Sequence, residues 1–139
     1  MTLRGRDAVL YGVNPHPQQL GDLGERLAER WVTRSGWQVI ARQFRIGHRD
    51  IDLIAKRANT IAFIEVKTRR RTDFGGPIAA VSAQKRRHLT HAAAIWTDRH
   101  GEPGWEYRFD VIGVLVGGGL IRIAHVENAF TAWEGRPRR

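Results

Sequence analysis

Two apolar segments, "DIDLIA" at residues 50–55 and "TIAFIEVK" at residues 60–67, constrain the fold more than any other feature of the sequence. Both are rich in isoleucine and a short polar segment separates them, which is typical of two antiparallel strands in a hairpin. Their apolar residues run together instead of alternating with polar ones, so both faces of each strand should be covered. We therefore expect this hairpin at the centre of a sheet.

The rest of the chain predicts a mixed α/β domain around that hairpin. Leucines at helical spacing, with Gly36 as a stop signal, predict a first helix over residues 18–35. A second helix is expected over residues 82–96, with Ser82 as its N-cap. Further strands are expected at residues 37–46, 106–116 and 120–127, the last two joined across three glycines in a second hairpin. The expected element order is α-β-β-β-α-β-β.

The length of 139 residues fits one domain. We expect a flexible arm at residues 1–17, the folded domain at residues 18–128 and a basic tail at residues 129–139. No apolar stretch approaches the roughly 18 residues of a membrane span, and the chain does not start with a signal peptide. The sequence has no cysteine, which fits a reducing cytoplasm. A cytoplasmic protein without a membrane partner is the expectation.

The balance of charge favours an anionic partner. Twenty-three Lys and Arg residues against fourteen Asp and Glu residues leave a net charge of +9. Such a surface attracts polyanions, and nucleic acid is the usual polyanion of a cytoplasm. Charge alone leaves open the alternative of a basic protein that is merely soluble.

Charged residues interrupt both central strands at the same end of the predicted hairpin. A turn centred between residues 58 and 59 sets Asp52 opposite Glu65 and Asp50 opposite Lys67, because opposed residues have numbers with a constant sum. A three-residue loop would instead place the two acids on opposite faces. The turn at Ala58 therefore decides whether these charges form one cluster.

Two opposed carboxylates repel each other, and a divalent cation relieves that repulsion best. Mg²⁺ or Mn²⁺ suits this position, because Mg²⁺ binds through one or two carboxylates and substrate phosphate. Lys67 beside such an ion could orient or deprotonate an attacking water. The structural alternative is that Asp50 and Lys67 form a simple cross-strand ion pair and that the acids are solvated at the strand ends.

Asp52 and the triplet Glu65-Val66-Lys67 together resemble the site of PD-(D/E)xK nucleases, whose core has a similar α-β-β-β-α-β order. Four blocks, "GERLAERWVTRSGWQVIARQFR", "DIDLIA", "FIEVKTR" and "RFDVIGV", are more specifically similar to the YraN family. That family consists of small bacterial proteins that are considered relatives of archaeal Holliday junction resolvases. The resemblance runs from about Gly24 to Val116 and implies a restriction-endonuclease-like α/β fold.

The resemblance also implies roles for individual residues. Asp52 and Glu65 would hold Mg²⁺ or Mn²⁺, the Val66 carbonyl would add a ligand, and Lys67 would serve the water. Asp50 stands where the family usually has glutamate, so it would support the site from behind the ligands on a shorter side chain. "RQFR" stands where the family prefers Arg-Asn-x-Arg.

Glu25 has two interpretations. The resemblance places it beside the metal. The helical pattern alone makes it a solvent-facing acid, because it lies away from the stripe formed by Leu20, Leu23, Leu27 and Trp31.

Basic residues follow the acid cluster and open the second helix. Arg69, Arg70 and Arg71 stand where a phosphate backbone would enter the site. Lys85 has two equally weighted interpretations, a phosphate contact at a helix N-terminus or a side chain that only extends to solvent from the apolar face. Asp110 is expected to be a structural partner for Arg or Lys, not a metal ligand.

We expect a metal-dependent endonuclease that binds nucleic acid, DNA rather than RNA, and hydrolyses phosphodiester bonds. Branched or Holliday-junction-like DNA is the substrate that the resemblance implies, and a homodimer would match a two-fold junction. The rival hypothesis is a non-catalytic nucleic-acid-binding module with the same fold. A third is an RNA- or ribosome-associated accessory protein, which would have the charge but no need of the acid cluster.

Overall fold

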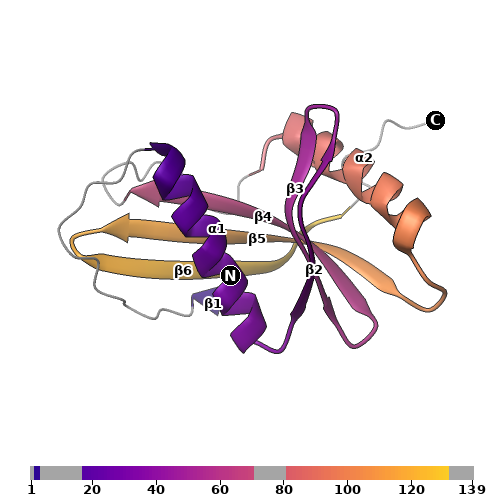
Figure 1. Cartoon of the computed structure of the whole chain (residues 1–139), viewed down its shortest axis with the longest axis horizontal. Coiled ribbons are helices and arrows are strands. Elements are labelled where there is room, and N and C mark those ends of the chain that lie inside the picture. The colour runs from indigo at the N-terminus through magenta and orange to yellow at the C-terminus, as the bar shows by residue number, and fades with distance from the viewer. Residues whose placement is uncertain (1, 4–16, 71–80, 132–139) are drawn as a thin grey trace.

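The computed structural model describes residues 2–3, 17–70 and 81–131, and these form one mixed sheet with a helix on each face (Figure 1). The two helices are α1 (Pro17–Arg34) and α2 (Ala83–His100). The strands are β1 (Thr2–Leu3), β2 (Gln38–Ile46), β3 (Arg49–Arg57), β4 (Thr60–Arg70), β5 (Glu106–Gly117) and β6 (Leu120–Phe130). Their order in the sheet is β1-β6-β5-β4-β3-β2.

The predicted α/β class and the order α-β-β-β-α-β-β are confirmed, with two differences in extent. The two-residue strand β1, which pairs with β6, lies within the predicted N-terminal arm and was not expected. Helix α2 begins after its predicted N-cap, Ser82, but continues to His100 instead of ending at Trp96. The rest of the arm, Arg71, the glycines at 75 and 76, and most of the C-terminal tail lie outside the described residues. No helix in the described part of the chain is long and apolar enough to cross a membrane.

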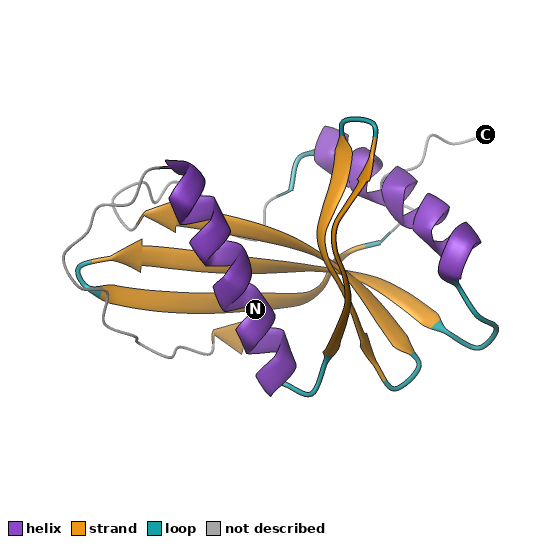
Figure 2. Cartoon of the chain, in the orientation of Figure 1, coloured by secondary structure: helices purple, strands orange, loops and turns teal. Residues whose placement is uncertain are grey.

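Strand β4 lies at the centre of the sheet and is covered on both faces, as its sequence predicts. It pairs with β3 in the antiparallel direction and with β5 in the parallel direction, and α2 makes the crossover between β4 and β5. Ile64 packs on the face covered by α1, whereas its neighbour Phe63 packs on the face covered by α2. The helices lie on different parts of the sheet, and the β2–β3 hairpin bends steeply away from β4, β5 and β6 (Figure 2).

Helix α1 packs on the sheet through small residues together with part of its leucine stripe, since Leu20 is buried in the same core and Leu27 and Trp31 pack against it. Ala28 and Val32 are fully buried, while Leu23 and Trp31 are only partly buried. The closest approach is at Gly24, where a Cβ atom would lie 1.8 Å from the Thr68 hydroxyl oxygen on β4. The buried side of the helix is therefore shifted from the leucine stripe toward the side that carries Glu25.

The β3–β4 hairpin has the predicted register. Arg57 pairs with Thr60 around a two-residue turn, and the ladder continues to Leu53 opposite Ile64. Ala58 takes a positive φ of 51° to make this turn, a conformation in which its Cβ is strained. Beyond Leu53 and Ile64 the pairing of β3 with β4 ends, although β3 still pairs with β2 as far as Arg49. We call this opening, between Asp52 on β3 and Val66 on β4, the fork.

Candidate active site

The fork is closed by a side chain instead of a backbone ladder. The backbone N–H of Val66 donates to Oδ2 of Asp52 at 2.8 Å. In an extended strand the N–H and C=O of one residue point to the same edge. The Val66 carbonyl therefore faces the fork as well, where the sequence analysis placed a metal ligand.

Glu65 and Asp50 lie on the α2 side of the fork and share one cation. The Lys85 ammonium, from the first turn of α2, lies 3.6 Å from Oε2 of Glu65 and 3.5 Å from Oδ1 of Asp50. The Glu65 side chain is only 13% exposed, so Lys85 offsets a charge that water reaches poorly. Lys85 thus contacts the acid cluster, a position that neither sequence-based interpretation of this residue included.

The electrostatics of the fork favour the retention of a proton. Burial, with the nearby charge of Glu65, raises the pKa of Asp52 to about 8, although the Val66 N–H opposes the rise. Burial also raises the pKa of Glu65, and Lys85 opposes this effect. Burial therefore favours the protonated form of both acids, and a cation bound to their oxygens would oppose this effect.

Lys67 follows the acid pair on β4 and has the opposite shift. Burial and the positive charge of Arg69 lower its pKa, and Glu65 works against them. A lowered pKa brings an amine closer to the neutral form that can accept a proton. Arg69 and Arg70 continue the same strand, with Arg69 exposed, while Arg71 lies outside the described residues.

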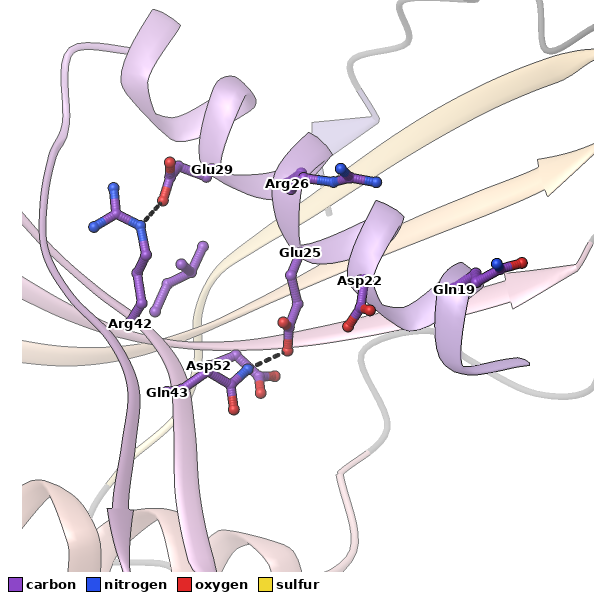
Figure 3. Close-up of a pocket in the computed structure, with 9 residues that line it drawn as sticks. Gln19, Asp22, Glu25, Arg26, Glu29, Arg42, Gln43 and Asp52 are labelled. Atoms are coloured by element: carbon purple, nitrogen blue, oxygen red, sulfur yellow. Dashed lines mark hydrogen bonds and ion pairs between the residues drawn. The ribbon is translucent and has the colours of Figure 1, made fainter. Parts of the chain in front are cut away.

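Glu25 reaches the site from the opposite face of the sheet. It follows Gly24 on α1, at the closest approach of this helix to β4, and it accepts a hydrogen bond from the Gln43 amide of β2 (Figure 3). Its charge contributes to the raised pKa of Asp52, so the two carboxylates affect each other. The structure thus places Glu25 beside Asp52, as the family resemblance implied and the helical pattern alone did not.

Two hollows meet at Asp52 and Glu25. One, of about 360 Å³, is lined by Glu65, Asp50, Lys85, Val66 and Arg69 in addition to those two acids. The other, of about 400 Å³, lies between α1 and β2, and its lining includes Gln43, Arg42, Asp22 and Glu29 (Figure 3). Asp52 and Glu25 therefore separate a mixed acidic and basic hollow from a second one along α1.

The donors at the fork fit a magnesium-like ion that is completed by substrate. Oε2 of Glu65 is buried and lies 3.6 Å from the Lys85 ammonium, which is too long for a strong hydrogen bond, so a closer cation could bind this oxygen. Asp52 adds an oxygen from the adjacent strand β3, and the Val66 carbonyl adds one from β4 itself. Within the described residues no three acidic, histidine or cysteine side chains are close enough to hold a metal by themselves. A pair of carboxylates suits Mg²⁺, which usually retains waters and takes phosphate ligands.

Basic groups that the sequence analysis did not assign extend the site along α2. The His48 ring, at the turn between β2 and β3, lies 5.1 Å from the His88 ring on α2. Desolvation and the positive groups around it, including His48 and Arg49, lower the pKa of His88. The hairpin tip and the start of α2 thus bring Arg49 and Lys85 near one another, while the lowered pKa favours the neutral form of His88.

Asp110 lies away from the fork in a separate buried network. It accepts hydrogen bonds from Arg108 at 2.9 Å and from the Asn128 backbone at 3.0 Å, and it lies 2.7 Å from Nε2 of His125. The Trp31 indole donates to the other nitrogen of that ring, which links α1 to β6. Asp110 is the structural partner of an arginine, as the sequence predicts.

Comparison with known proteins identifies the family of this chain and finds distantly similar solved structures. Residues 24–114 match the uncharacterised protein family UPF0102. The UPF0102 protein of Nocardia farcinica is 42% identical over 71% of this chain and 78% of its own length. The UPF0102 protein of Caldicellulosiruptor saccharolyticus is 38% identical over 81% of this chain and 98% of its own length. The structure of Pyrococcus furiosus SfsA in complex with Ca²⁺ is 11% identical and has a TM-score of 0.37, covering 88% of this chain and 75% of that one.

Proposed function

The chain belongs to the UPF0102 family, the YraN family of the sequence resemblance, and we propose that it is a metal-dependent endonuclease that hydrolyses phosphodiester bonds in DNA. The observation that carries the proposal is the acid pair at the fork. Asp52 and Glu65 both lie on covered strands, both have raised pKa values, and the buried Oε2 of Glu65 has only a long contact of 3.6 Å with Lys85. The burial of two acids reduces the stability of the fold. Acids with perturbed pKa values cluster at functional sites, where this cost is offset by a chemical use.

In this proposal, Asp52, Glu65 and the Val66 carbonyl hold Mg²⁺ or Mn²⁺. When bound, the ion would polarise a phosphoryl oxygen and lower the pKa of a water. Lys67 adjoins Glu65 on the same strand, and its lowered pKa suits a group that orients the water or accepts its proton. Glu25 adds negative charge from α1 on the other side of Asp52.

The substrate would be gripped by the basic residues around the fork. Arg69 and Arg70 extend β4 beyond the acids, and Arg71 follows them in the sequence. Lys85 balances the acids through Asp50 and Glu65, and once a metal ion takes over that task its ammonium can contact a phosphate. Asp50 then serves to hold Lys85 in place.

We further propose DNA rather than RNA, and branched DNA rather than plain duplex. Both rest on the sequence resemblance to Holliday junction resolvases, and fold analogy alone does not fix a substrate. A homodimer would place two such sites in the symmetric arrangement that a two-fold junction requires.

One observation favours a second candidate, a nucleic-acid-binding module without catalysis. Lys85 already lies within 3.6 Å of both Asp50 and Glu65, so an internal cation could balance these acids permanently. The charge of +9 would then serve binding alone. Metal dependence separates the two candidates, whereas salt dependence does not, because both predict strong weakening of binding by salt.

The test is cleavage of a labelled four-way junction, a flap, a duplex and a single strand, each with Mg²⁺, Mn²⁺ or EDTA. Glu65→Gln and Lys67→Ala remove the proposed ligand and the proposed water partner. Asp98→Asn, at an exposed position near the end of α2, is the matched control for the loss of one acid. Metal-dependent cleavage that is lost in Glu65→Gln and Lys67→Ala but retained in Asp98→Asn supports the endonuclease. If neither the parent nor any variant cleaves a substrate while all of them bind DNA equally well, the result supports the non-catalytic binding module.

A further inference from the structure

Gln43 is the residue whose conformation is hardest to explain from its own strand. It lies in the middle of β2 with a φ of +49°, in the left-handed region that a residue with a side chain rarely adopts. Its neighbours are ordinary in their pairing, since Arg42 pairs with Leu53 and Phe44 with Ile51. These two pairs share one register, so no residue is inserted and the irregularity is confined to Gln43.

The position of this irregularity coincides with the site. In the register of β2 with β3, the residue opposite Gln43 is Asp52. The Gln43 side chain leaves the sheet toward α1, where its Nε2 donates to Oε1 of Glu25 (Figure 3). Gln43, Glu25 and Asp52 line the same hollow. Unfavourable backbone conformations persist where the surrounding structure requires them, and they cluster at functional sites.

We propose that Gln43 is a positioning residue, whose left-handed backbone directs its amide onto Glu25 so that this carboxylate is held in one orientation beside the metal-binding pair. This inference rests on the proposed metal-dependent function. An amide donor on one carboxylate oxygen restricts the rotamers that the glutamate side chain can adopt. Residues that orient the groups around a metal site typically change metal affinity about 10- to 100-fold when they are replaced.

A purely structural role would be a link between α1 and β2, but that link exists without Gln43. The adjacent Arg42 forms an ion pair with Glu29, one helical turn beyond Glu25. The approach of α1 to the sheet is already set by the contact of Gly24 with Thr68. A residue in normal β conformation would therefore leave the packing of α1 intact, whereas it would move the donor away from Glu25.

Three variants separate positioning from packing. Gln43→Gly accepts a positive φ without strain but removes the amide. Gln43→Glu keeps the length and replaces the donor by a like charge that repels Glu25. Gln43→Asn keeps an amide on a shorter stem, in a residue that tolerates positive φ better, and matches the family pattern Arg-Asn-x-Arg. Arg42→Ala is the control, because it removes the parallel link between the same two elements.

The readouts are the Mn²⁺ dissociation constant by calorimetry, the melting temperature, and the kcat and KM for DNA cleavage. We expect Gln43→Gly and Gln43→Glu to weaken Mn²⁺ binding about 10- to 100-fold. Gln43→Gly should melt no lower than the parent, Gln43→Asn should recover part of the affinity, and kcat should fall more than KM rises. Arg42→Ala should lower the melting temperature with Mn²⁺ affinity unchanged.

The inference is overturned if Gln43→Gly binds Mn²⁺ as tightly as the parent does. It is also overturned if Gln43→Gly and Arg42→Ala both lose Mn²⁺ affinity in proportion to a lower melting temperature, because the loss would then reflect packing. Should Gln43→Gly fail to fold, the same comparison is made between Gln43→Asn and Gln43→Glu. If the parent protein binds no Mn²⁺ at all, both the proposed function and this inference are overturned. If the parent and the Gln43 variants bind Mn²⁺ equally well, this inference alone is overturned.

Discussion

The Asp52 carboxylate accepts the backbone N–H of Val66 at 2.8 Å, at the point where the ladder between β3 and β4 ends. One side chain thus terminates strand pairing and enters the acid cluster. The bond favours the ionised form, yet burial and Glu65 outweigh it and raise the pKa of Asp52 to about 8. The fork is therefore held by a group that is largely protonated at neutral pH in the absence of metal.

The raised pKa makes Asp52 a source of pH-dependent stability. The group titrates near 3.9 in the unfolded chain and near 8 in the folded one, so the folded state binds more protons between these values. The free energy of unfolding that this group contributes is fully present below about pH 4 and is lost as the pH rises to about 8.

Asp52→Asn should remove this dependence, because the amide oxygen still accepts from Val66 but does not titrate. In EDTA we expect the variant to gain in melting temperature over the parent as the pH rises from 5 to 8.5, on the order of 5 °C. Calorimetric scans at closely spaced pH values provide the measurement. A difference between the two proteins that stays constant over this range would contradict the raised pKa.

Metal binding should also report the proton that Asp52 carries, because a bound metal ion releases it. A metal ion must displace the proton of Asp52, so its apparent affinity should rise about tenfold per pH unit up to about pH 8 and then level off. Titration calorimetry of Mg²⁺ or Mn²⁺ in buffers of different ionisation enthalpy counts the protons released. Release of no proton at pH 7 would exclude Asp52 as a ligand with this pKa.

The central hairpin and its acids could be predicted from the sequence because their causes are local. The short segment between two apolar runs fixed the register, and the register placed Asp52 and Glu65 at one end. The face that α1 presents was not predictable in the same way. The leucine stripe is the more hydrophobic side, but close packing is decided by Gly24 against Thr68, a contact that hydrophobicity does not report.

Lys85 and Gln43 show the same limit of local patterns. The ion pairs of Lys85 depend on where the crossover helix α2 lands relative to β3 and β4. The positive φ of Gln43 has no signal in the sequence, because glutamine has no special tolerance for that conformation. Both residues are placed by tertiary structure, and both act on acids that the sequence had identified.

Removal of Lys85 should destabilise the metal-free protein and increase its response to metal. Lys85→Ala leaves Glu65, only 13% exposed, without its cation, and we expect a loss of about 1–2 kcal/mol. Mg²⁺ should raise the melting temperature of Lys85→Ala more than that of the parent, because the ion replaces the missing charge. Thermal scans with Mg²⁺ and with EDTA measure both effects.

Arg87→Ala is the matched control for Lys85→Ala, since it removes an exposed positive charge two residues away on the same helix. It should change neither the stability nor the response to Mg²⁺ by a measurable amount. If Lys85→Ala behaved like Arg87→Ala in EDTA, the ion pairs of Lys85 with Asp50 and Glu65 would contribute nothing to the stability of the fork.

Gly24 should be the position where α1 tolerates a side chain least. A Cβ there would lie 1.8 Å from the Thr68 hydroxyl and 2.9 Å from the Thr68 Cβ, so Gly24→Ala must push the helix away from β4. We expect a loss of about 1–3 kcal/mol from this overpacking. Because Glu25 is the next residue, the same displacement should weaken Mn²⁺ binding, which denaturant unfolding and calorimetry measure separately.

Gly21→Ala provides the comparison within the same helix. A Cβ at Gly21 meets nothing within 4 Å, so the substitution should raise stability by up to about 1 kcal/mol through helix propensity alone. The two alanine variants are chemically identical and lie on neighbouring turns of α1, so their difference isolates the contact with Thr68. Equal stability of Gly24→Ala and Gly21→Ala would show that α1 is not held at this distance from β4. Glu25 would then need another reason to lie beside Asp52.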